Sequence, residues 1–156
     1  MKRIAWLVLA TIVSASTVTF AVDKRKAEYV GGTIAGLKEK AEGRLDTTDE
    51  RYLMFNTEDA PTVRIPYRSI VELEYGQKAG RRVGVAILVS PLALFSKKRN
   101  HYLSISYKDE KGKEQAAIFE LGKDIVRPAL KVIETRSGKK IHYQDDEARK
   151  SGLGGN

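Results

Sequence analysis

Short runs of alternating apolar and polar residues dominate residues 28–121, and clusters of turn-forming residues separate them. A period of two residues is typical of strands that bury one face, so the pattern predicts an antiparallel sheet. We expect strands at 28–34, 41–47, 51–56, 62–67 and 70–76, and a hairpin within 101–122. The Gly31-Gly32 pair indicates a bulge, and Pro66 limits its strand to a sheet edge or a bulge.

The fifth strand and the hairpin predict which side chains meet the core. In residues 70–76, Val71, Leu73 and Tyr75 share one face, while Glu72 and Glu74 share the opposite, solvated face. The hairpin turns at 109–113, where Gly112 is available for positive φ. Its expected inward residues are Leu103, Ile105, Tyr107, Ala117, Phe119 and Leu121.

The hydrophobic period changes after Gly122, where a helix is expected. Its apolar stripe consists of Ile125, Val126, Ala129, Leu130 and Ile133. Asp124 is expected to cap the start and Gly138 the end, and Pro128 fits such a helix within its first turn. Residues 142–156 lack apolar periodicity, so we expect a flexible polar tail.

About seven strands followed by one C-terminal helix resemble the pleckstrin homology (PH)-like superfamily. The sequence IPYRSIVELEYG at 65–76 is similar to a phrase of bacterial PH and GRAM-like domains, and HYLSISYKDEKGKEQAAIFEL continues the likeness. The resemblance covers about residues 27–141. It implies a mostly β fold, a bent barrel or roll of antiparallel strands capped by the helix, and a binding role for lipids, peptides or proteins.

Lipid-binding PH domains carry basic residues around their first two strands, and Lys38, Lys40 and Arg44 lie there in this chain. The K-x-R pairing of many such domains is absent, which argues against phosphoinositides as ligands.

The first residues have the pattern of an export signal. Lys2 and Arg3 precede an apolar run, and small residues follow it. We expect cleavage after Ala21, with Ala15 as the alternative site. An uncleaved anchor is the competing interpretation, because a spanning helix needs about 20 apolar residues. The predicted division is a signal peptide at 1–21, a PH-like domain at 22–141 with an apolar insertion at 77–100, and the tail.

The chain is exported in this interpretation, and its location is periplasmic or extracellular. It carries a net charge of +8 and no cysteine. The absence of cysteine excludes disulfides and a lipid-modified cysteine. The positive charge favours anionic surfaces, and an exported protein seldom meets chromosomal DNA, so no nucleic-acid partner is expected.

Thirteen uncharged residues, 83–95, stand between two basic clusters. A helix of this length measures ~20 Å, short of the ~30 Å bilayer core, and Pro91 would break it. The segment either folds back onto the barrel mouth, enters the bilayer interface, or packs on a partner or a second copy. The candidate membrane or partner contacts are Arg81, Arg82, Ile87, Leu88, Leu92, Leu94, Phe95, Lys97, Lys98 and Arg99.

The sequence contains no recognisable catalytic, cofactor or metal site. His101 and His142 are the only histidines, are not spaced as ligands, and are expected at solvated or edge positions. Glu72 and Glu74 are the one carboxylate pair that a hydrolase mechanism could use, although alternation on a solvated face explains them. The glycines match no phosphate-binding fingerprint.

The leading hypothesis is therefore an exported, non-enzymatic PH-like binding module. It is peripheral to the membrane through the basic-flanked apolar loop and binds anionic lipid or a membrane-associated protein. The alternative is an assembly subunit whose apolar loop forms an oligomer or partner interface. An envelope hydrolase is the third hypothesis.

Overall fold

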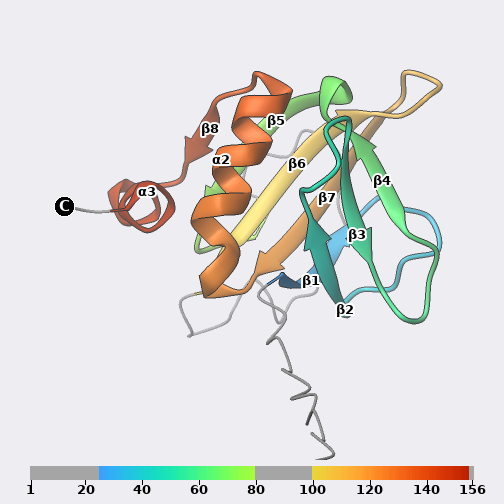
Figure 1. Cartoon of the computed structure of the whole chain (residues 1–156), viewed down its shortest axis with the longest axis horizontal. Coiled ribbons are helices and arrows are strands. Elements are labelled where there is room, and N and C mark those ends of the chain that lie inside the picture. Colours follow the sequence, from blue (N-terminus) through green and yellow to red (C-terminus); the bar gives the residue numbers. More distant parts are fainter. Residues whose placement is uncertain (1–24, 80–99, 155–156) are drawn as a thin grey trace, which may run out of the picture.

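The structure is a computed structural model that describes residues 25–79 and 100–154. Figure 1 shows a bent sheet with helix α2 lying against it. The first half of the fold comprises β1 (Lys26–Gly32), β2 (Ala41–Asp46), β3 (Tyr52–Asn56), β4 (Val63–Pro66), the 3-10 turn η1 (Tyr67–Ser69) and β5 (Ile70–Gly76). The second half comprises β6 (Tyr102–Lys108), β7 (Glu114–Leu121), η2 (Lys123–Ile125), α2 (Val126–Ser137), β8 (Ile141–Tyr143) and α3 (Asp146–Leu153).

The eight strands form one open sheet in the order β4-β3-β2-β1-β7-β6-β5-β8. All neighbouring strands are antiparallel except β5 and β8, which are parallel. The mostly β class with a C-terminal helix is thus confirmed. The predicted edge position of Pro66 is also confirmed, because β4 ends the sheet. The register between β1 and β7 shifts between Tyr29 and Gly31, which confirms the bulge.

The β6–β7 hairpin forms as predicted. Lys108 pairs with Glu114, and Gly112 adopts a φ of 76° in the turn. The Asp109 carboxylate accepts hydrogen bonds from the backbone N–H groups of Lys111 and Lys113, both at 2.9 Å. The turn is therefore fixed by the side chain at its first position.

The core lies between one face of the sheet and α2. The helix contributes Val126, Ala129, Leu130 and Ile133, which confirms its predicted stripe. Gly138 ends α2 with a φ of 67°, as expected. The predicted cap at Asp124 is wrong: the residue before α2 is Ile125, and no side chain caps the helix. Pro128 lies in the first turn, where its missing N–H costs no helical hydrogen bond.

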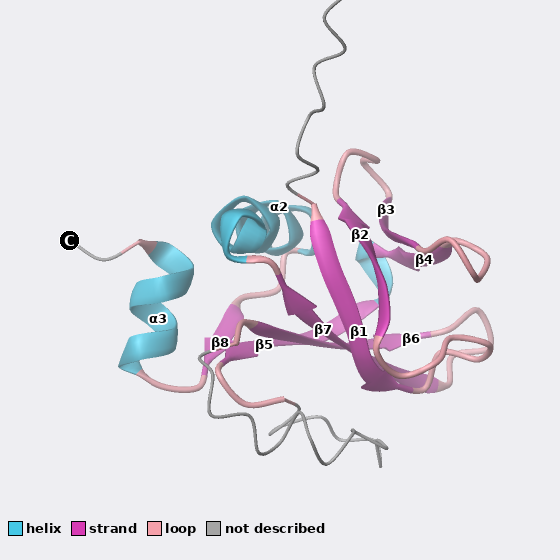
Figure 2. Cartoon of the chain, turned by 90° about the horizontal axis from the view of Figure 1, so that it is seen from below, coloured by secondary structure: helices cyan, strands magenta, loops and turns pink. Residues whose placement is uncertain are grey.

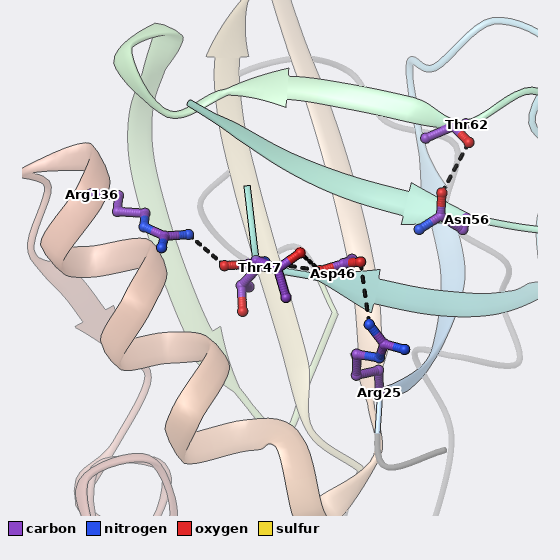
Figure 3. Close-up of polar contacts among 7 residues, drawn as sticks. Arg25, Asp46, Thr47, Asn56, Thr62 and Arg136 are labelled. Atoms are coloured by element: carbon purple, nitrogen blue, oxygen red, sulfur yellow. Dashed lines mark hydrogen bonds and ion pairs between the residues drawn. The ribbon is translucent and has the colours of Figure 1, made fainter. Parts of the chain in front are cut away.

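Arg136 fastens α2 to the β2–β3 connection. Its guanidinium donates a hydrogen bond to the carbonyl oxygen of Thr47 (Figure 3) and another, of 2.7 Å, to that of Asp49. The guanidinium also lies over the ring of Tyr67, 5.6 Å from its centroid. These contacts attach the helix to the β1–β4 half of the sheet as well as to the β5–β7 half.

Strand β5 departs from simple alternation. A register shift between Ile70 and Glu72 leaves Val71 46% exposed and places Ile70 in the core, while Leu73 and Tyr75 point inward as predicted. The prediction that Glu74 is solvated is wrong, because this residue is only 4% exposed. Its carboxylate accepts a hydrogen bond of 2.8 Å from the Gln144 side chain, which lies just after β8.

The predicted flexible tail at 142–156 instead contains the last two residues of β8 and all of α3, so that prediction is wrong over 142–153. The side chain of Asp145 caps α3 by accepting a 2.7 Å hydrogen bond from Ala148 N–H. Ala148 and Gly152 are the buried residues of this helix. Two small buried residues leave little apolar periodicity, which explains why the pattern is missed. No helix within 25–79 and 100–154 has the length and apolar character needed to cross a membrane.

Candidate functional site

A groove of about 1020 Å³ lies between the β1–β2 loop and the β3–β4 loop, beside strands β1 and β2. Both loops can be followed at one end of the β1–β4 half of the sheet in Figure 1. Its basic lining residues are Lys26, Lys38, Lys40 and Arg44, and its acidic lining residues are Glu39, Glu42, Glu58 and Asp59. The fold therefore brings together the three basic residues that the sequence places around the first two strands.

The charges of the groove are divided between its two walls. The four basic residues all come from β1, β2 and the loop between them, whereas the β3–β4 loop supplies Glu58 and Asp59. Lys26 Nζ lies 3.3 Å from a carboxylate oxygen of Glu42, but both side chains are mostly exposed, so the ion pair is weak. The β1–β2 wall is positive overall, and the facing wall is negative.

The backbone of the β1–β2 loop is held by specific contacts. Ile34 and Leu37 pack against the core, and Lys40 N–H donates a 2.7 Å hydrogen bond to the carbonyl oxygen of Tyr29. Lys40 has a φ of 63°, a left-handed conformation that few residues other than glycine adopt. Such strained positions gather at binding sites. The apolar contacts leave the side chains of Lys38 and Lys40 exposed beside the groove.

The β3–β4 loop is tied by its own polar residues. Thr62 donates a hydrogen bond of 2.9 Å from its hydroxyl to Asn56 Oδ1 (Figure 3). Ala60 N–H donates to the Thr57 hydroxyl oxygen at 3.1 Å. These bonds hold Glu58 and Asp59 at the tip of the loop, facing solvent.

A second hollow of about 660 Å³ lies between β3, β4 and the β6–β7 turn. The carboxylates of Asp49 and Asp109 in this hollow accept hydrogen bonds from nearby backbone N–H groups. Hydrogen bonds from the N–H groups of Arg51 and Tyr52 lower the pKa of Asp49, and the N–H of Lys113 lowers the pKa of Asp109. We therefore assign these two residues to turn stabilisation.

Tyr75, His101 and Ser151 form a polar chain at the edge of the core. The Tyr75 hydroxyl lies 2.6 Å from His101 Nδ1 and 3.2 Å from Ser151 Oγ, and Ser151 donates to the carbonyl oxygen of Ala148. His101 is therefore half-buried and bonded, where the sequence predicted a solvated or edge position. Burial and the charge of Lys123 lower its pKa. These hydrogen-bonded side chains join α3 to the sheet.

The other predicted site residues fall into two groups. All ten candidate contacts between Arg81 and Arg99 lie outside the described residues. Glu72 and Glu74 are described, and neither lines the two hollows above. In the described part of the chain, no group of three or more His, Asp or Glu residues is placed to hold a metal ion.

The sequence did not predict that Glu58 and Asp59 face the lysines of the β1–β2 loop. The turn chemistry of residues 57–61 marks a loop, but its position opposite another loop depends on the pairing of β2 with β3. A scan against models of protein families finds no match for the chain, and a search of curated proteins finds none either.

Proposed function

We propose that this chain is an exported, non-enzymatic PH-like binding module that contacts an anionic phospholipid surface through the groove between the β1–β2 and β3–β4 loops. The observation that carries the proposal is the positive wall of this groove, with Lys38 and Lys40 exposed on a loop whose backbone is fixed. Ammonium groups of this kind bind phosphate oxygens as point charges.

The strand order supports the PH-like assignment. Strands β1–β4 and β5–β7 are two meanders joined by the β1–β7 pair, and α2 follows β7 directly and packs in the bend. The strand order and the helix after β7 agree with the resemblance, while closure of the sheet into a barrel or roll is part of the proposal. The parallel strand β8 and helix α3 are additions at the β5 edge.

Electrostatics favour attraction to an anionic leaflet. The full chain has a net charge of +8, and removal of Lys2 and Arg3 with the predicted signal leaves +6; each basic residue near such a surface contributes about 1 kcal/mol. Within the groove, the phosphate would lie against the β1–β2 wall, because Glu58 and Asp59 repel it from the other side. Cleavage and export through the signal predicted at 1–21 would put this contact at the outer face of the cytoplasmic membrane.

The apolar insertion is a second candidate for the membrane contact. Strands β5 and β6 stay paired as far as Gly76 and Tyr102, so residues 77–101 form the connection of a hairpin. Hairpins of this kind need about two to five loop residues. The additional length is not required to join the strands, and it contains the ten residues from Arg81 to Arg99 proposed as contacts.

Flotation with vesicles tests both candidates. The sheet and both helices lie within 25–154, so the chain from Val22 onward retains the described contacts and lacks the apolar signal. We expect it to float with vesicles of phosphatidylcholine and phosphatidylglycerol and not with phosphatidylcholine alone. Lys38→Glu with Lys40→Glu should abolish flotation.

The matched control is Lys139→Glu with Lys140→Glu, which makes the same charge change at two exposed lysines after α2. This control should keep most of the binding if the groove is the site. Equal losses of flotation in the two double-lysine variants would show that only the net charge of the protein matters. That result would reject the groove as the binding site. If flotation is lost in the Leu88→Asp, Leu92→Asp double variant but kept in Lys38→Glu with Lys40→Glu, the insertion is favoured as the membrane contact.

A further inference from the structure

The sheet has a second buried face, opposite α2. Residues alternate along each strand, so the neighbours of the core residues Leu103 and Phe119 point to this other side. Cross-strand register places Glu74, Ser104 and Ile118 in one row across β5, β6 and β7. Their exposed fractions are 4%, 3% and 0%. Because solvent hardly reaches these three side chains, other residues must lie over this face of the sheet.

Helices α2 and α3 do not supply the cover. Residues of α2 and α3 belong to the same cluster as Leu103, on the first face, and Figure 2 shows α2 on one side of β5, β6 and β7. On the second face, Val30, Tyr102 and Ile118 form a separate cluster. Within residues 25–79 and 100–154, the one member of this cluster outside the strands is Ala79.

The two ends of the undescribed internal stretch lie at this face. Ala79, the residue before it, is 3% exposed and contacts the second cluster. Asn100, the residue after it, donates hydrogen bonds to Tyr102 Oη at 3.0 Å and to Glu120 Oε2 at 3.1 Å. The described chain therefore stops at Ala79 and resumes at Asn100 beside the patch that needs a cover.

The composition of the stretch matches the patch. Residues 83–95 carry no charge, which suits the cluster of Val30, Tyr102 and Ile118. Two arginines, 81 and 82, directly precede them, and the same face carries the carboxylates of Glu74 and Glu120. Charged groups that are buried in proteins are usually paired with an opposite charge.

We propose that residues 83–95 dock on the second face of the sheet, over Val30, Tyr102 and Ile118, with Arg81 and Arg82 beside Glu74 and Glu120. The occupant is thus a segment of the same chain. This inference is independent of the lipid groove, and it accounts for the apolar insertion as the cover of a second core. It therefore excludes the insertion as the second candidate for the membrane contact and predicts that Leu88 and Leu92 are not available to a membrane.

Thiol accessibility tests the docking, because the chain has no cysteine. Leu88→Cys and Leu92→Cys are introduced separately into the full chain, and their reaction with a maleimide is followed without vesicles. The control is Val71→Cys, at a position that is 46% exposed. We expect both segment thiols to react about tenfold or more slowly than the control, and all three to react alike in urea.

Reaction as fast as the control would overturn the docking, and would mean that another segment, such as residues 1–24, covers the face. Protection that requires added vesicles would assign the segment to a membrane, and protection that rises with protein concentration would assign it to a second copy. Either result contradicts the proposal.

A cross-link gives a second measurement that does not depend on rates. Ser104→Cys is a nearly isosteric change at the centre of the face, so folding should be retained. Combined in turn with Ile87→Cys, Leu88→Cys or Leu92→Cys, it should form an intramolecular disulfide in at least one pair under mild oxidation. Disulfides between chains only, or none in any pair, would contradict the docking.

Discussion

The hydroxyl of Tyr75 lies 2.6 Å from Nδ1 of His101, and the two rings stack with an interplanar angle of 6°. Tyr75 is on β5, and His101 immediately precedes β6. The same hydroxyl reaches Ser151 on α3. One buried phenol thus joins two strands and the last helix, and it does so at the edge where the sequence suggested an irregular tail.

Tyr75→Phe removes this hydroxyl and leaves His101 and Ser151 without it. The free energy of unfolding should fall by about 0.5–1.5 kcal/mol, the usual contribution of such a hydrogen bond. Amide hydrogen exchange in α3 should speed up more than in α2. Urea unfolding and exchange measurements check both parts, and unchanged exchange in α3 would show that the polar chain does not hold this helix.

Tyr67→Phe is the same chemical change with the opposite expectation. The Tyr67 hydroxyl is buried and has no hydrogen-bond partner among the described residues, while Arg136 lies over the ring. Burial raises the pKa of this phenol, and the nearby Arg136 guanidinium acts in the opposite direction without making a hydrogen bond of normal geometry to the hydroxyl. Removing an unpaired buried hydroxyl should leave stability unchanged or increase it by up to about 1 kcal/mol. A loss as large as that of Tyr75→Phe would disprove the assignment.

The stability of the protein should depend on pH through His101. Burial and Lys123 lower the pKa of its imidazole below the ordinary 6.5. The unfolded chain then binds more protons than the folded one near this pH, so the free energy of unfolding falls as the pH drops below 6.5. Urea unfolding at about pH 7.5 and about pH 5.5 measures the difference, which His101→Gln should reduce.

The carboxylates act in a lower pH range and do not obscure this effect. Hydrogen bonds from Thr48 outweigh the effect of burial and lower the pKa of Asp46, and turn hydrogen bonds lower those of Asp49 and Asp109. Their stabilisation is lost as the pH falls through folded-state pKa values below 3.8. An identical pH dependence in wild type and His101→Gln would assign the titration near 6.5 to another group.

Gly152→Ala separates helix propensity from packing. Alanine favours a helix by about 1 kcal/mol over glycine, but a Cβ at this position would lie 2.6 Å from Tyr143 Cε1 and 3.2 Å from Leu130 Cδ1. Overpacking of this kind costs about 1–3 kcal/mol, so the variant should be less stable than wild type. Thermal unfolding checks this, with Lys150→Ala, an exposed position on α3, as the control. A more stable Gly152→Ala would mean that α3 docks loosely.

The parts of the fold that alternate in sequence could be predicted, and the parts that depend on distant partners could not. The β6–β7 hairpin follows from the spacing of Leu103, Ile105 and Phe119. Glu74 looks solvated by the same rule, yet it is only 4% exposed and accepts a hydrogen bond from Gln144, seventy positions away. Strand β8 has three residues, too few to show a period, and it forms because β5 offers an open edge.

The candidate site divides in the same way. The PH-like resemblance draws attention to Lys38, Lys40 and Arg44 around the first two strands, although the missing K-x-R pairing kept them out of the expected contacts. Glu58 and Asp59 could not be set opposite them, because that requires the pairing of β2 with β3 and the resulting approach of two loops. Sequence patterns therefore identify one wall of the groove, and the sheet register supplies the other.

The most direct measurement of the central claim is a titration of the ¹⁵N-labelled chain with a soluble short-chain phosphatidylglycerol, below the concentration at which it forms micelles. The account predicts that the largest amide chemical-shift changes occur in residues 36–44 and 56–60, and that Lys38→Glu with Lys40→Glu removes them. Shifts that are absent, or that concentrate on α2, α3 or the β6–β7 turn instead, would contradict headgroup binding in the groove.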